Sequence, residues 1–146
     1  MKLQFLLVET LQELVRIWDI IEPGLENILQ YSHKDDDEEF ILDQLATRSM
    51  FLVLITCDDN YCGFFTIRFI NSYYNGKIEK CLIPNHFFMD ESFQHKNIWV
   101  DVEQYIEQFA IKSNCKIIKT YTMRNVEKRM NKCGYKKTYT EYVKEL

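Results

Sequence analysis

In the second half of the chain, the spacing of the apolar residues changes from a continuous run to a helical period and back again. Residues 87–89 are apolar, residues 90–97 form a polar loop, and the apolar positions within 98–110 recur every three or four residues, as one face of a helix requires. Segment 116–123 is short and rich in β-branched and aromatic residues, which favours a strand. The pattern predicts a strand, a loop, a helix that ends near Asn114, and a parallel return strand.

The C-terminal end of the chain predicts one more helix and one more strand. Asn125 can cap the start of a short helix over 125–133, and Gly134 stands where a left-handed residue can close it. Residues 135–143 alternate between apolar and polar types, which is typical of a strand.

The first thirty residues predict a strand followed by a helix. Residues 1–8 form an apolar run, and Thr10 with Glu13 has the spacing of a capping box. Pro23 cannot continue the hydrogen-bond ladder, so we expect it to interrupt the helix and to leave 25–30 as a separate turn or a kinked extension. The apolar residues that would share one side of this helix are Leu11, Leu14, Val15, Trp18 and Ile21.

Turn residues divide the middle of the chain into strands. Residues 58–60 form one turn, and Asn75-Gly76 is the strongest hairpin signal in the chain. Pro84 cannot donate to a strand ladder, so it indicates an edge or a bulge before Phe87. The strands predicted here span residues 49–57, 61–70 and 77–83.

Together these elements predict a single domain over residues 1–146, of the α+β or α/β class. We expect a mixed, mostly antiparallel sheet of six to seven strands with helices on both faces. Its defining feature would be a parallel pairing between the segment around Phe87 and the segment around Ile118.

The acidic run at residues 35–39 has two interpretations. A carboxylate cluster can bind a metal ion, but no glycine-containing calcium-loop spacing follows this one. The run precedes the apolar residues Phe40, Ile41 and Leu42, which places it where a helix N-terminus favours negative charge. We therefore interpret the run as a helix start, and no metal site is predicted.

Composition and charge limit the classes of partner. Of the 146 residues, 47% are hydrophobic and 14% aromatic, which excludes general disorder. The formal net charge is -4, and because non-specific nucleic-acid binding depends on clustered Lys and Arg, no nucleic-acid partner is expected. We interpret the local basic residues within 128–137 as a solvated surface, and we recognise neither a membrane span nor a signal peptide.

The five cysteines are scattered, without a CxxC pair or a Cys-His cluster of zinc spacing. Most lie in or beside predicted strands, where cysteine packs as a small apolar residue. We expect five free thiols in a reducing cytoplasm.

The order and lengths of the C-terminal elements, with Asn125 and the closing Gly134-Tyr135, resemble the C-terminal half of the GNAT superfamily of acyl-CoA-dependent N-acyltransferases. The resemblance covers about the last two-thirds of the chain. It implies a sheet that splays open to admit acyl-CoA, with backbone amides of the loop before the long helix holding the pyrophosphate. The cofactor-binding residues that it implies are Gln94, His95, Lys96, Asn97, Ile98 and Asn125.

Two departures from the family pattern bear on activity. Family members commonly carry Gln or Arg, then Gly and a second small residue in this loop, and the matching positions here are Gln94, Asn97 and Trp99. Neither Asn nor Trp gives a phosphate the clearance that Gly provides. The family's general-acid tyrosine falls on Met130, which cannot donate a proton. A degenerate acyl-CoA site is therefore predicted, with no cofactor expected; acetyl-CoA is the cofactor if the chain is an enzyme.

Three residues are weak candidates for a catalytic base. His86 lies in or beside a strand, and we interpret it as a packed residue in preference to a catalytic base. Glu79 precedes the expected cleft and Glu91 follows it, and neither has a sequence partner that would tune its pKa.

The sequence from Trp18 to Gly24 resembles small GNAT-like proteins encoded among the morphogenesis genes of tailed bacteriophages. This resemblance implies a setting in the host cytoplasm or in a phage particle. Our first hypothesis is a non-catalytic binding or structural component that has a protein partner and contacts neither nucleic acid nor membrane. The alternative is an active acetyl-CoA-dependent N-acetyltransferase, and the oligomeric state is left open.

Overall fold

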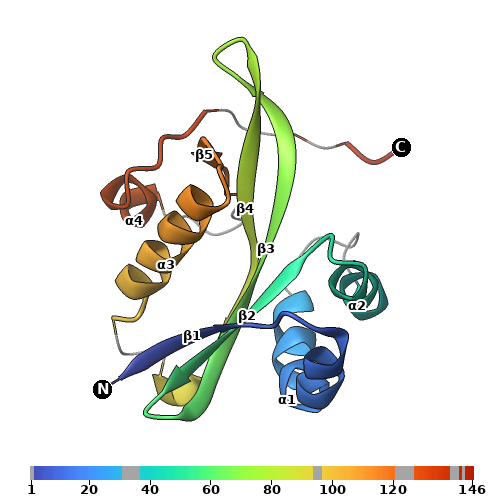
Figure 1. Cartoon of the computed structure of the whole chain (residues 1–146). Helices are drawn as coiled ribbons and strands as arrows, with labels where there is room; N and C mark the ends of the chain where they lie inside the picture. Colours follow the sequence, from blue (N-terminus) through green and yellow to red (C-terminus); the bar gives the residue numbers. More distant parts are fainter. Residues whose placement is uncertain (1, 31–36, 94–96, 121–126, 139–141, 143) are drawn as a thin grey trace.

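The computed structural model describes residues 2–30, 37–93, 97–120, 127–138, 142 and 144–146. Within these ranges a five-stranded sheet, in the order β1-β2-β3-β4-β5, separates the helices α1 and α2 from the helices α3 and α4 (Figure 1). Neighbouring strands are antiparallel, except that β4 and β5 are parallel. The strands are β1 Leu3–Leu7, β2 Phe51–Cys57, β3 Asn60–Tyr74, β4 Lys77–Met89 and β5 Ile117–Ile118. The helices are α1 Leu11–Leu29, α2 Glu38–Ala46, the 3-10 turn η1 Glu91–Phe93, α3 Trp99–Lys112 and α4 Glu127–Lys132.

This mixed sheet with helices on both faces confirms the predicted fold class. The predicted count of six or seven strands is wrong for the described part of the chain, which forms five. One strand is lost because 77–83 and 87–89 belong to the same strand, β4. Another is lost at the C-terminus, where 135–138 form no strand; residues 139–141 and 143 of that prediction lie outside the described residues.

β4 continues through Pro84 because the strand bulges there. Ile67 of β3 faces Pro84, whereas Phe65 faces Phe87, so β4 fits one extra residue into this interval. A bulge leaves one residue without a ladder partner, and proline, which has no N–H group, is tolerated at such a place. The predicted bulge before Phe87 is confirmed.

An apolar core lies on each face of the sheet. On the α3 face, the helix packs its buried side on β2, β3 and β4, with Phe65 and Ile67 at the centre. On the α1 face, α1 and α2 cover Leu52 and Phe64. The buried helix residues of the α3 face are Ile98, Val102, Ile106 and Ala110, and those of the α1 face are Leu14, Ile21, Leu25, Ile41 and Leu45.

α1 runs through Pro23 as one continuous helix, so the predicted interruption is wrong. The proline removes one backbone hydrogen bond, but the residues on both sides of it, Ile21 and Gly24, are buried, and tertiary packing outweighs the local cost. The predicted apolar stripe is also partly wrong. Leu11 and Val15 are 58% and 70% exposed, because the buried stripe is shifted around the helix.

The predicted turns and helix ends are confirmed by backbone conformation. The two residues between β2 and β3, Asp58 and Asp59, and the two between β3 and β4, Asn75 and Gly76, all have positive φ. This left-handed conformation is cheap for Gly and tolerated by Asn and Asp, and tight hairpin turns require it. Positive φ also marks the predicted ends of α3 and α4, at Asn114 and Gly134.

Side-chain caps begin α1 and α2. The Thr10 hydroxyl oxygen accepts from the backbone N–H of Glu13 at 3.1 Å, which confirms the predicted helix start. Asp37 Oδ1 accepts from the backbone N–H of Phe40 at 2.7 Å. The capping interpretation of the acidic run is therefore confirmed at Asp37; the first two residues of the run, 35 and 36, lie outside the described residues.

The cysteines are free thiols, and Cys57, Cys62 and Cys81 are buried. None of the helices in the described ranges is both long and apolar enough to cross a membrane.

Candidate functional site

β5 separates from β4 after a short pairing. Cys81 pairs with Ile117 and Leu82 with Ile118, and the N–H of Lys119 donates to the Leu82 carbonyl at 3.0 Å. The two strands are neighbours, as predicted, but the predicted pairing around Phe87 is wrong. No described residue pairs with this edge of β4 beyond Leu82. Among the described residues, the pairing along this edge of β4 therefore ends at Leu82, and the GNAT resemblance places the cofactor beside the last residues of the strand.

The bulge of β4 carries a buried histidine. Thr66 of β3 lies opposite the bulge, and its hydroxyl oxygen accepts from the backbone N–H of His86 at 3.0 Å. The same oxygen lies 2.8 Å from His86 Nδ1. The Thr66 hydroxyl therefore bonds both the backbone and the ring of His86, and which of Oγ1 and Nδ1 is the donor depends on the imidazole tautomer. Only 6% of His86 is exposed, which agrees with its interpretation as a packed residue.

An aromatic pair lies at the last residues of β4. Trp99, the first residue of α3, meets Phe87 of β4 edge to face, with ring centroids 5.5 Å apart and an interplanar angle of 82°. Phe87 is 37% exposed and Trp99 is half-buried, and neither residue belongs to the apolar core under α3. The indole therefore extends from the start of α3 to the part of β4 that has no β5 neighbour.

The N-terminus of α3 differs from those of α1 and α2. Its N-cap residue is Ile98, which is buried and supplies no capping side chain. Asn97 is exposed immediately before it. Amides of an uncapped first turn can receive an anion, and the helix dipole favours one. Of the predicted cofactor-binding residues, the structure places Asn97 and Ile98 at this helix end, whereas Gln94, His95, Lys96 and Asn125 lie outside the described residues.

The two candidate carboxylate bases lie at opposite ends of β4. Glu79 is near the hairpin turn, opposite Ser72, and Glu91 is exposed in η1, after the strand has ended. A strand rises about 3.3 Å per residue, so roughly 40 Å of chain separates them. They cannot belong to one site, and the third candidate, His86, is buried in the bulge of β4 against Thr66.

The loop after β4 contains a fixed carboxylate. The Ser92 hydroxyl donates to Asp90 Oδ1 at 2.6 Å, and the Ser92 backbone N–H donates to the same oxygen at 3.0 Å. These hydrogen bonds lower the pKa of Asp90, since they favour its charged form.

A hydrogen bond between the half-buried Tyr135 and the buried Glu103 joins the segment after α4 to α3, and our sequence reasoning missed it. The Tyr135 hydroxyl donates to Glu103 Oε2 at 3.1 Å. Burial raises the pKa of Glu103, and burial together with the neighbouring Glu103 charge raises the pKa of Tyr135. The signal was available in the spacing, because Glu103 precedes the buried Ile106 and Ala110 by three and seven positions on one helix.

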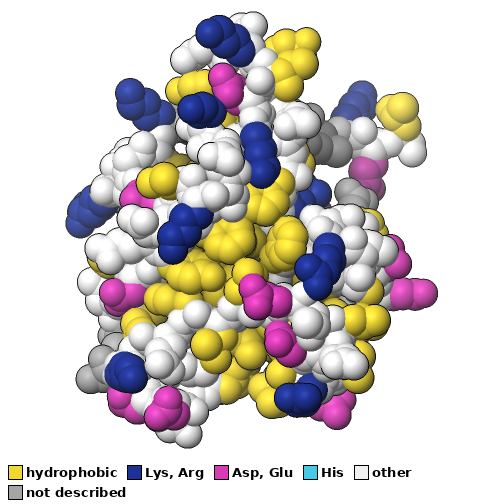
Figure 2. Space-filling model, viewed as in Figure 1, with side chains coloured by type: hydrophobic (Ala, Val, Ile, Leu, Met, Phe, Trp, Pro, Cys, Tyr) yellow, Lys and Arg dark blue, Asp and Glu magenta, His cyan; other side chains and the backbone are white. Residues whose placement is uncertain are grey.

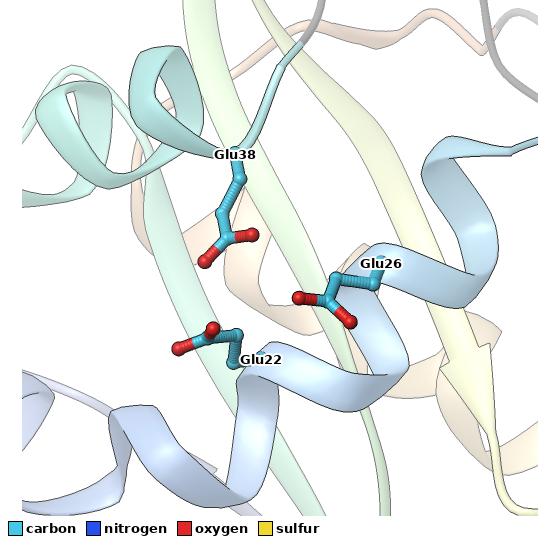
Figure 3. Close-up of side chains that lie close together, drawn as sticks. All are labelled: Glu22, Glu26 and Glu38. Carbon is cyan, nitrogen blue, oxygen red and sulfur yellow. The ribbon is translucent and has the colours of Figure 1, made fainter.

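Three carboxylates converge on the opposite side of the sheet. Glu22 and Glu26 of α1 and Glu38 of α2 point toward one another, with one oxygen of each within 4.8 Å of the others (Figure 3). Burial and the charges of Glu22 and Glu26 raise the pKa of Glu38. Glu38 comes from the acidic run of the sequence, but the run gave no sign that α1 would supply its two neighbours.

Comparison with known proteins identifies solved structures that share this fold. No family model matches the chain, and no curated protein does. Solved structures do match over nearly the whole chain. The ribosomal-protein-alanine N-acetyltransferase from Brucella melitensis biovar Abortus 2308 superposes with a TM-score of 0.74 at 16% identity, over 99% of both chains. A GNAT family acetyltransferase from Staphylococcus aureus subsp. aureus USA300_TCH1516 gives a TM-score of 0.70 at 17% identity, over 100% of both.

A third structure was solved with a cofactor-derived ligand. The aminoglycoside acetyltransferase AAC(6')-Iy, in complex with a CoA bisubstrate analog, superposes with a TM-score of 0.72 at 12% identity, over 100% of this chain and 99% of that one. Identities this low show a common fold and do not transfer an activity. The predicted GNAT fold is confirmed, and it extends over the N-terminal part of the chain as well.

Proposed function

We propose that this GNAT-fold chain is a binding protein that works without acyl-CoA. The observation that carries the proposal is the contact between Phe87 and Trp99, 5.5 Å between ring centroids, in the part of β4 that lies beyond its last pair with β5. In this proposal the aromatic pair occupies the entrance that the cofactor would use.

The described side chains at the start of α3 fit an acyl-CoA pyrophosphate poorly. A phosphate comes close to backbone amides only where the side chains are small, and Asn97, Ile98 and Trp99 are all large. A buried indole removes about 150–250 Å² of surface from water, and at about 25 cal/mol per Å² its displacement would cost several kcal/mol. Because Trp99 is only half-buried, displacing its indole would cost only part of that free energy.

Calorimetry with acetyl-CoA tests the proposal. We expect no heat of binding from the wild-type protein at high micromolar acetyl-CoA. The double variant Phe87→Ala with Trp99→Ala removes both rings and should gain measurable affinity, because the uncapped amides of α3 then become accessible. The matched control is Tyr73→Ala with Tyr74→Ala, which removes two exposed rings at the far end of β3 and should leave binding absent.

Tight acetyl-CoA binding by the wild-type protein would contradict the proposal. A thermal shift gives an independent measurement, since a ligand at a hundred times its dissociation constant stabilises the folded state by about 2.7 kcal/mol.

An acetyl-CoA-dependent N-acetyltransferase is the second candidate. The N-terminus of α3 favours it, since the N-cap residues of α1 and α2 each supply a side-chain cap and the N-cap residue of α3, Ile98, supplies none. Under this candidate, Trp99 swings away when the cofactor enters, and the wild-type protein binds acetyl-CoA.

The proposed binding function needs a partner, and we expect a protein that contacts the tip of the β3–β4 hairpin. This hairpin projects beyond the helices (Figure 1), and Figure 2 shows hydrophobic side chains at its end as well as over the middle of the same face. Tyr73 and Ile78 are cross-strand neighbours, 74% and 64% exposed, with Lys77 beside them. The tip would suit an apolar surface that offers a carboxylate to Lys77. In the phage setting implied by the N-terminal resemblance, this partner would be a virion protein.

Paired variants test the partner surface. Tyr73→Ser with Ile78→Ser should abolish binding of a partner that the wild-type chain retains. Leu11→Ser with Val15→Ser, which removes comparable exposed apolar surface from α1, should leave that partner bound. Equal loss in both variants would contradict a role for the hairpin.

A further inference from the structure

An arginine in the middle of β3 has a buried donor without an acceptor. Nε of Arg68 is shielded from solvent and has no hydrogen-bond partner among the residues that the structure describes, although the residue as a whole is part-exposed. Buried polar groups are normally satisfied, and a charged donor is the kind least easily left unpaired. This donor therefore needs an acceptor that the described residues do not provide.

The neighbours of Arg68 explain why none is available. Arg68 alternates with Ile67 and Phe69, which face α3, so it projects on the α1 face together with Thr66. Its cross-strand neighbour is Ile83, which is buried and apolar. The Thr66 hydroxyl is already bonded to the backbone and ring of His86. Within the described part of the chain, Arg68 forms no ion pair either.

Arg68 belongs to a small group of polar residues on an otherwise apolar face of the sheet. Thr66 and His86 are two of the buried polar residues of the protein, and Arg68 lies two positions from Thr66 on the same side of β3. A guanidinium donates two parallel hydrogen bonds to a carboxylate or a phosphate group, and such charge-assisted bonds are among the strongest in proteins. Arg68 as a residue is part-exposed, so a solute can contact its side chain from outside although the Nε atom itself is shielded.

We propose that Arg68 binds an oxyanion, the carboxylate or phosphate group of a small ligand, on the α1 face of the sheet beside His86. The site is on the opposite face from the Phe87–Trp99 pair, because Trp99 belongs to α3 and Phe87 pairs with Phe65 of the core under α3. It therefore stands whether or not acyl-CoA can enter the gap beside β4.

The experiment compares inorganic phosphate and acetate on three proteins at constant pH and ionic strength. The proteins are the wild type, Arg68→Met, and the matched control Arg16→Met, which removes the same charge from an exposed position on α1. The readouts are the NMR signal of the Arg68 Nε–H group and the midpoint of thermal unfolding. In the wild type, one of the two anions should shift the Nε–H signal saturably and raise the midpoint.

The variants distinguish a site from a general salt effect. Arg68→Met should abolish the anion response, and without anion its midpoint should exceed that of the wild type, since an apolar side chain replaces an unpaired donor. Arg16→Met should respond as the wild type does. Saturation by phosphate at the lower concentration assigns a phosphate ligand, and saturation by acetate assigns a carboxylate.

Three results would overturn the proposal. One is a wild-type Nε–H signal that neither anion shifts saturably. Another is an equal response in all three proteins, which would show screening of surface charge. The third is a midpoint of Arg68→Met below that of the wild type in the absence of anion, which would show that Nε has an acceptor within the protein.

Discussion

The hydroxyl of Tyr135 donates to the carboxylate of Glu103 across 3.1 Å, and this bond ties the segment after α4 to the middle of α3. Glu103 is buried and Tyr135 is half-buried, so the bond satisfies a carboxylate that is largely shielded from water. Burial raises the pKa of Glu103; the Tyr135 bond opposes that shift, and the nearby Glu107 adds to it.

The raised pKa of Glu103 predicts a pH dependence of stability. The folded protein holds a proton on Glu103 more tightly than the unfolded chain does. The contribution of this group to the free energy of unfolding is therefore largest below the ordinary glutamate pKa and falls as the pH rises through the raised folded value. Glu103→Gln keeps an oxygen for Tyr135 and removes the titration. Urea unfolding should show the variant more stable than the wild type at neutral pH, with the advantage lost in acid.

A similar argument applies to the carboxylates between α1 and α2. Glu22→Gln removes one of the charges that raise the pKa of Glu38. The Glu38 pKa should fall toward its ordinary value, and the free energy of unfolding at neutral pH should rise. Because the wild-type pKa is raised, the gain should appear above about pH 4.5 and vanish below it. NMR titration of the Glu38 carboxyl carbon and urea unfolding measure the two effects.

The control for this prediction is Glu39→Gln. Glu39 is exposed in the first turn of α2 and is not one of the three converging carboxylates. Its charge favours the helix N-terminus, so its loss should lower stability by about 0.3–1 kcal/mol. Stabilisation by both variants would indicate an effect of net charge alone.

The close approach of α1 to β4 predicts that Gly24 cannot be enlarged. A Cβ atom at this position would lie 2.7 Å from the Phe88 ring, and Phe88 is stacked on Phe64 at 5.7 Å between centroids. Alanine favours a helix interior over glycine by about 1 kcal/mol, but overpacking typically costs about 1–3 kcal/mol. Gly24→Ala should therefore destabilise the protein in denaturant unfolding. The double variant Gly24→Ala with Phe88→Leu should recover part of the loss.

Removing the Thr66 hydroxyl should destabilise the protein at the bulge of β4. Thr66→Val keeps the shape but leaves the backbone N–H and Nδ1 of His86 without this partner. An unsatisfied buried group costs about 1–3 kcal/mol, so the free energy of unfolding should fall by at least that amount. Thr66→Ser retains the hydroxyl and should lose much less. Equal losses would show that the methyl group, and not the hydrogen bonds, stabilises the bulge.

Local signals in the sequence predicted the fold class well. Turn residues with positive φ, such as Asn75 and Gly76, determine the conformation of only a few neighbouring positions, and so do capping residues such as Thr10. Their effects can therefore be predicted from the local sequence alone. Pro23 was misread because the packing of α1 on β4, which a sequence does not display, outweighs the loss of one hydrogen bond.

The candidate site was less predictable, since its residues meet through tertiary contacts. The family pattern identified Trp99 as unusual, but only the structure showed that its ring contacts the Phe87 ring edge to face. The partners of His86 and Glu103, and the isolation of Arg68, depend on side chains that are far away in sequence. Spacing can suggest that a polar residue is buried, but it does not say what that residue contacts.

The length of the β3–β4 hairpin sets an order of folding. Its pairs run from Tyr74 with Lys77 out to Gly63 with Met89, all within one short stretch of chain. Closing a loop costs more entropy as it lengthens, so this hairpin should form before β1 pairs with β2, where Leu3 must find Cys57. During synthesis α1 emerges directly after β1, yet Phe88, on which α1 packs, comes much later. Nascent chains stopped before residue 80 should therefore leave α1 open to proteases and chaperones, and those extended past residue 120 should protect it.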